Sequence, residues 1–388
     1  MPLGMKFRIY PNKMQKNLID HTFGCSRLIY NRGLELRKKS YDDGNPIGYS
    51  ETSKMLTELK KSDEYSFLKD VDSIALQQAL RDLDKAYKSF FKKQSSFPVF
   101  KSKRSAKQSY RTQYQNNNIA IVGKYIKLPK LGYVKIKQSR EICGKINNVT
   151  VERTLTDKYF VVLNVEQDYV PNVSSNKSVG IDVGLKDFYT DSNAHKVSNE
   201  RFLSKDFKKL VREQRKLSKI IECNICDYKV VGNKRYPIYR KPLDECKNIQ
   251  KQRIQVAKVH ERIANKRNDF LHKESTKLIN DNQVICIEDL NVKGLLKNHK
   301  LARSISDVSW GSFYSMLEYK AIRNNRIVVK VPRFYPSSQI CSCCGNRDKR
   351  LKDLKIRKWT CEKCHSVHDR DVNAAINILN KGLEMLAS

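Results

Sequence analysis

The chain has 388 residues, enough for two or three domains, and 39% of them are hydrophobic, so it can form buried cores and is not a disordered tail. Its 76 Lys and Arg against 41 Asp and Glu give a formal net charge of +35, which favours nucleic acid as the partner over a merely solvated basic surface. No apolar run approaches the length of a bilayer span, and the start, MPLGMKFRIYP, lacks the apolar core of a signal peptide. We therefore expect no membrane partner and a cytoplasmic location, where the 11 Cys would not form a disulfide framework.

The first half of the chain changes from a helical to a β-rich pattern. KFRIYP predicts a short strand ended by Pro11, and apolar residues at helical spacing predict helices over 15–41 and 73–93. Short alternating runs between about 101 and 170 predict a small barrel or sheet, which the first strand could join. The composition of 171–178 is typical of a linker, so a new domain is expected after it.

The second half predicts an alternation of strands and helices, and therefore an α/β domain. Its expected elements are a strand at 178–183 turning at Gly184 into a second strand, basic helices at 203–221 and 247–280, a strand at 283–290, a helix at 309–322, a strand at 326–332 and a final helix at 369–386.

Three acids of this second half stand where an acid is poorly tolerated without a role. Asp182 lies inside the apolar strand SVGIDVG, Glu288 ends the apolar strand VICIEDL, and Asp371 begins the last helix, where a capping role is the alternative. The three are too far apart in sequence to pair locally. If the fold brings them together, they form a site for Mg²⁺ or Mn²⁺, and two such ions can hydrolyse a phosphodiester.

The cysteines form two groups of different strength. Cys341 and Cys344 are followed, after sixteen residues, by Cys361 and Cys364, and this spacing of two CxxC pairs predicts a structural zinc ribbon with a closed tetrahedral site. Cys223, Cys226 and Cys246 offer one CxxC and a third thiol without an evident fourth ligand. Surface thiols in a loop are the favoured interpretation of that second group, and a metal site is the alternative.

The segment from Phe100 to Asn118 interleaves basic, aromatic and amide residues. Lys101, Lys103 and Arg104 can contact phosphates, while Tyr110 can stack on a base. A solvated loop is the alternative interpretation of this composition.

GIDVGLKDF, ICIEDLNVKGL and HDRDVNAAINIL resemble the three motifs of the RuvC nuclease domain in TnpB proteins, which are relatives of type V CRISPR effectors. The order Asp, Glu, Asp differs from that of DDE transposases, whose Glu comes last. The segments KFRIYPNKMQKNLIDHTFGCSRLIYN, FPVFKSKRS and SYRTQYQNNN resemble the amino-terminal half of the same proteins. The resemblance covers nearly the whole chain, although His365 stands where the family usually has Gly.

The resemblance implies a multidomain α+β fold. A wedge-like β-barrel would comprise 1–12 and 98–172, with a helical recognition region, 13–97, inserted into it. An RNase H-like (RuvC) domain would follow at 173–388, with the zinc ribbon, 335–367, inserted into it. The segment holding Cys223, Cys226 and Cys246 looks like an insertion relative to the family.

The resemblance also implies the activity of an RNA-guided DNA endonuclease that makes double-strand breaks beside a short motif and serves transposon maintenance. Asp371, the Asp before x-Asn-Ala, would be the third catalytic acid, with Asp369 as the alternative. Tyr49, Ser53, Gln77 and Gln115 would read the motif beside the target.

The implied partners are a guide RNA derived from the transposon end and target double-stranded DNA, in a monomeric ribonucleoprotein of a prokaryotic, nucleoid-associated kind. Two rival functions remain: a guided DNA-binding repressor of the same ancestry, which the presence of all three acids disfavours, and an accessory transposition protein that only binds the ends of its element.

Overall fold

The structure is a computed structural model that describes residues 2–104, 108–167, 171, 175–353 and 355–388. The chain forms two compact units, Met1–Asp168 and Tyr169–Ser388. The expected domain boundary at 172–173 and part of the expected linker at 171–178 lie outside the described residues.

A seven-stranded antiparallel sheet forms the centre of the first unit. Its order is β2-β6-β7-β1-β5-β4-β3, so the amino-terminal strand joins the later strands, as the sequence suggested. The strands are β1 (Pro2–Tyr10), β2 (Gln108–Gln113), β3 (Ala120–Val122), β4 (Tyr125–Leu128), β5 (Gly132–Lys137), β6 (Lys145–Arg153) and β7 (Tyr159–Glu166). Alternate residues of β7, among them Val161 and Leu163, are fully buried, which is the pattern of a sheet with one face on a core.

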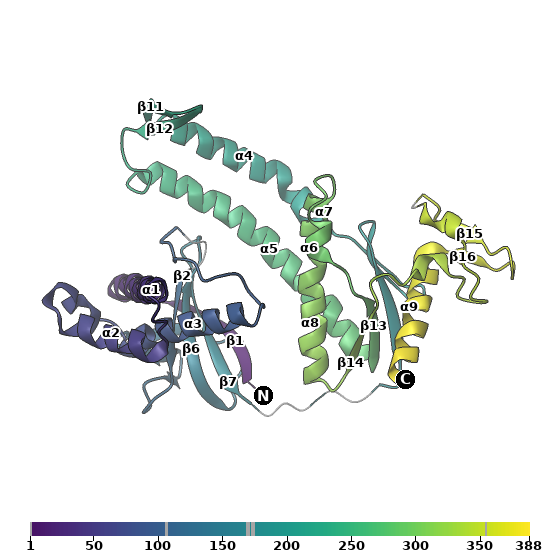
Figure 1. Ribbon diagram of the computed structural model, residues 1–388, viewed down its shortest axis with the longest axis horizontal. Coiled ribbons are helices and arrows are strands. Elements are labelled where there is room, and N and C mark those ends of the chain that lie inside the picture. The colour runs from purple at the N-terminus through teal and green to yellow at the C-terminus, as the bar shows by residue number, and fades with distance from the viewer. Residues whose placement is uncertain (1, 105–107, 168–170, 172–174, 354) are drawn as a thin grey trace. The chain divides into compact units, whose positions relative to one another are not determined.

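Helices complete the first unit (Figure 1). They are α1 (Lys13–Asp42), α2 (Tyr49–Lys61), the 3₁₀ helix η1 (Asp63–Lys69) and α3 (Ser73–Phe91). α1 begins with a capping box in which Asn12 and Gln15 each accept the other's backbone N–H, a motif that contributes on the order of 1 kcal/mol. Gly33 allows α1 to approach α3, because a Cβ there would lie 2.8 Å from Leu80 Cδ2. The sequence predicted α1 and α3 but not α2 as a separate helix.

The second unit contains a mixed five-stranded sheet in the order β10-β9-β8-β13-β14. Its strands are β8 (Ser178–Val183), β9 (Asp187–Asp191), β10 (Lys196–Ser198), β13 (Val284–Glu288) and β14 (Ile327–Val331). β8 pairs with β9 antiparallel and with β13 parallel, and β13 pairs with β14 parallel. β13 is buried on both faces, as its apolar sequence predicted.

Helices cover both faces of this sheet, which makes the second unit α/β. Ile285 and Ile287 of β13 share a core with residues of α5 (Lys247–Asp281) and α8 (Trp310–Arg323), while Cys286 packs with Ile378 of α9 (Arg370–Ala387). Figure 1 shows β13 and β14 between α8 and α9. α9 lies unusually close to the strands: a Cβ on Gly180 would meet Ala375 O at 2.2 Å.

The remaining elements are connections and small insertions. α4 (Phe202–Glu222) packs along α5, and the hairpin of β11 (Ile225–Val231) and β12 (Lys234–Tyr239) joins them at the far end of the pair (Figure 1). α6 (Val292–Leu295) and α7 (Ala302–Val308) connect β13 to α8; η2 (Ser337–Gln339), η3 (Lys349–Lys352), β15 (Lys358–Thr360) and β16 (Val367–Asp369) precede α9. In the described part of the chain, every helix is too short or too polar to cross a bilayer.

Candidate active site and metal centre

The three acids singled out in the sequence lie at one corner of the five-stranded sheet. Asp182 is near the end of β8 and Glu288 is the last residue of β13. These strands are parallel neighbours in which Ile181 pairs with Ile287, so the two acids follow side by side at the carboxyl ends of both strands. Asp371 is in the first turn of α9, which packs on β8. Residues far apart in sequence thus converge.

Burial and the two other carboxylates disfavour the charge of Asp182. Burial raises the pKa of Asp182 well above its usual value, and repulsion from Glu288 and then from Asp371 raises it further, against the attraction of Arg370 and Arg357. Burial likewise raises the pKa of Glu288. A raised pKa means that the protein resists the charged form, and a divalent cation is the kind of group that could offset this cost.

The acids are spread more widely than the ligands of a single closed metal cage. Within the described ranges, the sets of three or more potential ligand atoms that lie within 4.8 Å of one another are made of cysteine sulfurs and one histidine nitrogen, and the three carboxylates do not form such a set.

Two further side chains contact the acids directly. The Ser337 hydroxyl donates to Glu288 Oε1 at 2.7 Å, and this bond opposes the rise in the pKa of Glu288 that burial causes. Arg357 Nη1 lies 3.4 Å from Asp371 Oδ1, and the Arg357 side chain is half exposed. Sequence reasoning identified neither residue, because a lone Ser or Arg beside a cysteine knuckle carries no pattern of its own.

Asp369 has a different set of contacts from Asp371. Its Oδ1 accepts the backbone N–H of Asp371 at 3.1 Å and of Val372 at 3.2 Å, so Asp369 is the N-cap of α9. Its Oδ2 pairs with Lys196 Nζ at 2.8 Å. Although burial opposes the shift, Lys196 and the Val372 N–H lower the pKa of Asp369. The capping role considered for Asp371 thus belongs to Asp369, and the Asp371 carboxylate is not used as a cap.

Two buried asparagines of α9 hold the segment that carries Ser337. Asn377 donates to the carbonyl oxygens of Ser337 at 2.8 Å and of Ile340 at 2.6 Å. Asn373 donates to Ile340 O at 2.7 Å and accepts the N–H of Ser342 at 2.9 Å. We call this pair, Asn373 and Asn377, the amide clamp. Because it satisfies backbone groups on both sides of Cys341, it fixes Ser337 relative to α9.

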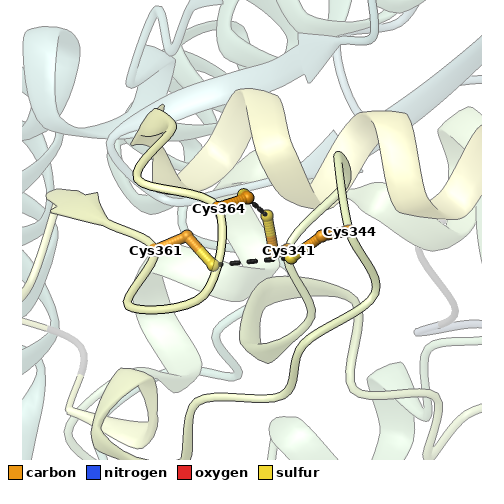
Figure 2. A group of neighbouring side chains, drawn as sticks. All are labelled: Cys341, Cys344, Cys361 and Cys364. Carbon is orange, nitrogen blue, oxygen red and sulfur yellow. Dashed lines mark hydrogen bonds between the residues drawn. The ribbon is translucent and has the colours of Figure 1, made fainter.

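Four cysteines form the second candidate centre (Figure 2). The sulfur atoms of Cys341, Cys344, Cys361 and Cys364 lie within 4.8 Å of one another, and the pairs Cys341–Cys364 and Cys344–Cys361 are both 3.6 Å apart. Four thiolates bound tetrahedrally at about 2.3 Å from a zinc ion would be about 3.8 Å apart. The donor set and its spacing therefore fit zinc, with no open position for a substrate.

Hydrogen bonds prepare one of these thiols for metal binding. Although burial opposes the shift, bonds from the backbone N–H of Cys344 and from the Ser366 hydroxyl lower the pKa of Cys341 to about 6. His368 Nε2 lies 3.1 Å from the same sulfur, and with Cys343 it forms an overlapping group of ligand atoms. Because both groups share Cys341, they cannot bind separate ions, and the four-cysteine set has the complete tetrahedral complement.

The second group of cysteines, for which a metal site was the alternative interpretation, does not form a metal-ligand cluster in the described residues. Cys226 is exposed in β11, Cys223 is exposed just before this strand, and Cys246 precedes α5. Among the described residues, no set of potential metal ligands includes any of these three cysteines. The sulfur of Cys226 lies 3.4 Å from Ile238 O, within the hairpin.

Most residues predicted to contact nucleic acid are accessible on the first unit. Tyr49 and Ser53 lie on α2 and are partly exposed, while Gln77 on α3 is exposed. The Tyr49 hydroxyl accepts from Arg81 Nε at 3.4 Å. Exposed residues of the later segment are Lys101, Lys103, Arg104 and Gln115.

Tyr110 does not fit the predicted stacking contact with a base. Its side chain is 6% exposed and packs against Phe23, with 5.8 Å between the ring centroids, in the core of the first unit. β2 is a short edge strand whose sequence alternates weakly, so its buried face could not be identified from the sequence.

Family models match three parts of the chain. One described as "Probable transposase" (OrfB_IS605) matches residues 159–226 and 227–299, with the break inside β11. A "Helix-turn-helix domain" of the same group (HTH_OrfB_IS605) matches 1–45, where the structure has one strand and one long helix. A "Cas12f1-like, TNB domain" matches 310–378, the part that contains the four cysteines.

Curated relatives match the chain over nearly its whole length. A "Putative RNA-guided DNA endonuclease" of Streptomyces pristinaespiralis is 39% identical over 98% of this chain and 89% of its own length. The "Putative RNA-guided DNA endonuclease InsQ" of Escherichia coli is 32% identical over 99% of this chain and 93% of its own length. A "TnpB-like protein" of Acanthamoeba polyphaga mimivirus is 26% identical over 98% of this chain and 73% of its own length.

Solved structures show a related fold. The chain in a cryo-EM structure of a Cas12f1–sgRNA–target DNA complex aligns over 98% of this chain and 99% of its own length, with a TM-score of 0.59 at 12% identity. The mini-RNA-guided endonuclease CRISPR-Cas_phi3 aligns over 99% of this chain and 92% of its own length, with a TM-score of 0.51 at 10% identity. Together with the full-length curated relatives, these matches show that the chain belongs to the TnpB family of transposon-associated proteins.

Proposed function

We propose that this protein is an RNA-guided DNA endonuclease that hydrolyses phosphodiester bonds at Asp182, Glu288 and Asp371. The observation that carries the proposal is the convergence of these acids, from two parallel strands and a helix, into a cluster that raises the pKa of Asp182. The relatives described as RNA-guided DNA endonucleases support the same reaction.

Each acid has a distinct structural role in the proposed site. Divalent metal ions, when bound there, would activate water and neutralise the leaving oxygen of an in-line displacement. Asp182, whose pKa burial and the two other acids raise well above its usual value, would hold metal together with them. Glu288 is oriented by Ser337, and Asp371 lies at the helix end, where Arg357 balances its charge.

The proposed domain assignment follows from the two sheets. The sheet of the first unit corresponds to a wedge-like barrel formed by 1–12 and 98–172, with 13–97 as the recognition region. For 173–388, the order β10-β9-β8-β13-β14, with antiparallel strands leading to parallel ones, supports an RNase H-like (RuvC) domain. The ribbon, 335–367, would hold a structural zinc ion at its four cysteines.

The proposed partners are a guide RNA from the transposon end and double-stranded target DNA, bound by a monomer in the prokaryotic cytoplasm at the nucleoid. The charge of +35 supports contacts to two nucleic acids. In this division of labour, protein side chains such as Tyr49, Ser53, Gln77 and Gln115 read a short duplex motif, and base pairing reads the rest of the target.

The proposal is tested by cleavage of a target plasmid in Mg²⁺ with protein purified together with its co-expressed RNA. Loss of an outer partner of a metal ligand costs up to about 100-fold in activity. Asp182→Asn changes a proposed ligand itself, so it should lower the cleavage rate by more than this and leave RNA binding unchanged. Asp187→Asn, a neighbouring acid on β9, serves as the matched control and should cleave normally.

Two outcomes would overturn parts of the proposal. Binding of the target by the wild type without any cleavage in Mg²⁺ would show a guided DNA-binding protein instead. Unchanged target choice after the RNA is removed with ribonuclease would exclude guidance by RNA.

A further inference from the structure

An aromatic cavity lies in the helical part of the first unit, whereas the three acids and the four clustered cysteines belong to the second unit. Its volume is about 510 Å³, within the range of ligand pockets. It is lined by the ends of α1 and α3 and by the segment that follows α3. Its main lining side chains are Lys38, Tyr41, Tyr87, Phe90, Phe91 and Phe97; we call it the aromatic pocket.

One wall of the aromatic pocket is held rigidly. The Phe97 ring meets the rings of Tyr87 and Phe90 edge-on, with centroid distances of 5.5 and 5.2 Å. Arg37 lies over the Tyr87 ring at 4.1 Å, pairs with Asp84 at 3.3 Å and donates to a backbone carbonyl. A wall fixed in this way loses little freedom when a flat ligand stacks on it.

The other side of the pocket is exposed aromatic surface. Phe91 is 72% exposed and Tyr41 is 73% exposed, although both are large rings that gain free energy when covered. The Phe91 ring lies 6.3 Å from Tyr87 and 5.4 Å from Phe90, so it continues the fixed wall outward. Exposed rings grouped around a cavity are typical of a surface that a ligand covers.

The charge of the surrounding chain identifies the class of ligand. Residues 85–104, KAYKSFFKKQSSFPVFKSKR, contain six Lys and one Arg but no Asp or Glu. Lys38 adds a cation directly over the Phe97 and Phe100 rings, at 5.4 and 4.8 Å, while Asp42 is the acid at the pocket lining. Cations interleaved with aromatic rings bind the phosphates and bases of a single strand, and repel a basic protein surface such as a second copy of this chain.

We propose that the aromatic pocket binds an unstacked base of an RNA strand, with the Phe91 and Tyr41 rings stacking on it and the nearby lysines contacting its phosphates. Duplex DNA keeps its bases inside the stack, whereas loops and ends of RNA present unstacked bases to aromatic side chains. The proposal goes beyond the nuclease site and requires binding of RNA but no cleavage.

Affinity measurements with the full-length, RNA-free protein test the stacking contact. The probe is a fluorescent single-stranded oligouridine of about 12 nucleotides, within the usual range of site sizes. Phe91→Ala and Tyr41→Ala should each weaken binding by about 5- to 150-fold, the measured range for loss of one stacked base. Phe91→Trp should keep the affinity, because it restores a stacking ring, and Tyr319→Ala on α8 is the control for loss of an exposed ring elsewhere.

Chemical probing of the co-purified ribonucleoprotein tests the same contact on its natural RNA. Unpaired bases protected from base-modifying reagents in the wild type should become reactive in Phe91→Ala and remain protected in Tyr319→Ala. Equal oligouridine affinity and equal protection in wild type and Phe91→Ala would overturn the proposal. Weaker binding of oligothymidine alone, with oligouridine binding unchanged, would overturn the choice of RNA.

Discussion

Replacing Ser337 with alanine is expected to weaken metal-dependent cleavage, because its hydroxyl donates to Glu288 at 2.7 Å and is itself buried. A hydrogen bond to a charged group contributes about 1.5–3 kcal/mol, which corresponds to a factor of about 10 to 150. The loss also removes the contact that opposes the raised pKa of Glu288, so this carboxyl should accept a proton more readily. Metal binding should then require a higher concentration and a higher pH.

Plasmid cleavage measured against Mg²⁺ concentration and against pH gives both quantities. We expect the Mg²⁺ midpoint of Ser337→Ala to rise by about 10- to 100-fold, the usual effect of removing an outer partner of a metal ligand, and the acid limb of the pH profile to move upward. Ser342→Ala is the matched control, because the backbone N–H of Ser342, rather than its hydroxyl, bonds Asn373. An unchanged Mg²⁺ midpoint and pH profile in Ser337→Ala would refute the reasoning.

Other perturbations separate the contributions of fold, charge and metal. Asp371→Asn should abolish cleavage and leave stability unchanged, whereas Asp369→Ala, which removes the N-cap, should mainly weaken the start of α9, by about 0.5–2 kcal/mol in denaturant unfolding. Gly180→Ala should destabilise the protein by about 1–3 kcal/mol or more, because its Cβ would meet backbone, while Gly311→Ala has free space and should not destabilise it. In metal-free protein, the pKa of Asp182 is higher in the folded than in the unfolded chain, so stability falls as pH rises from the unfolded pKa of about 3.9 toward the folded pKa. At a pH above the folded pKa and without Mg²⁺, Asp182→Asn should therefore raise the unfolding temperature, and a fall would contradict the repulsion between the acids. Native mass spectrometry should find a single zinc ion, lost on substitution of a knuckle cysteine and retained in Cys226→Ser.

The sequence alone determined the features that depend on local patterns. The helix over 247–280 was predicted within one residue of α5, because apolar spacing along a helix is a property of neighbouring residues. The four-cysteine cluster was predicted for the same reason, since each CxxC forms its own turn. Acids inside apolar strands identified Asp182 and Glu288 as unusual, because burial of an acid has a large free-energy cost.

Only the tertiary structure decided how these parts meet. The contacts of Ser337 with Glu288 and of Arg357 with Asp371 join segments that no sequence spacing relates. The burial of Tyr110 depends on which face of an edge strand meets the core, and a register change of one residue would reverse it. The aromatic pocket likewise requires the ends of two helices to lie together, because its rings come from residues about fifty positions apart.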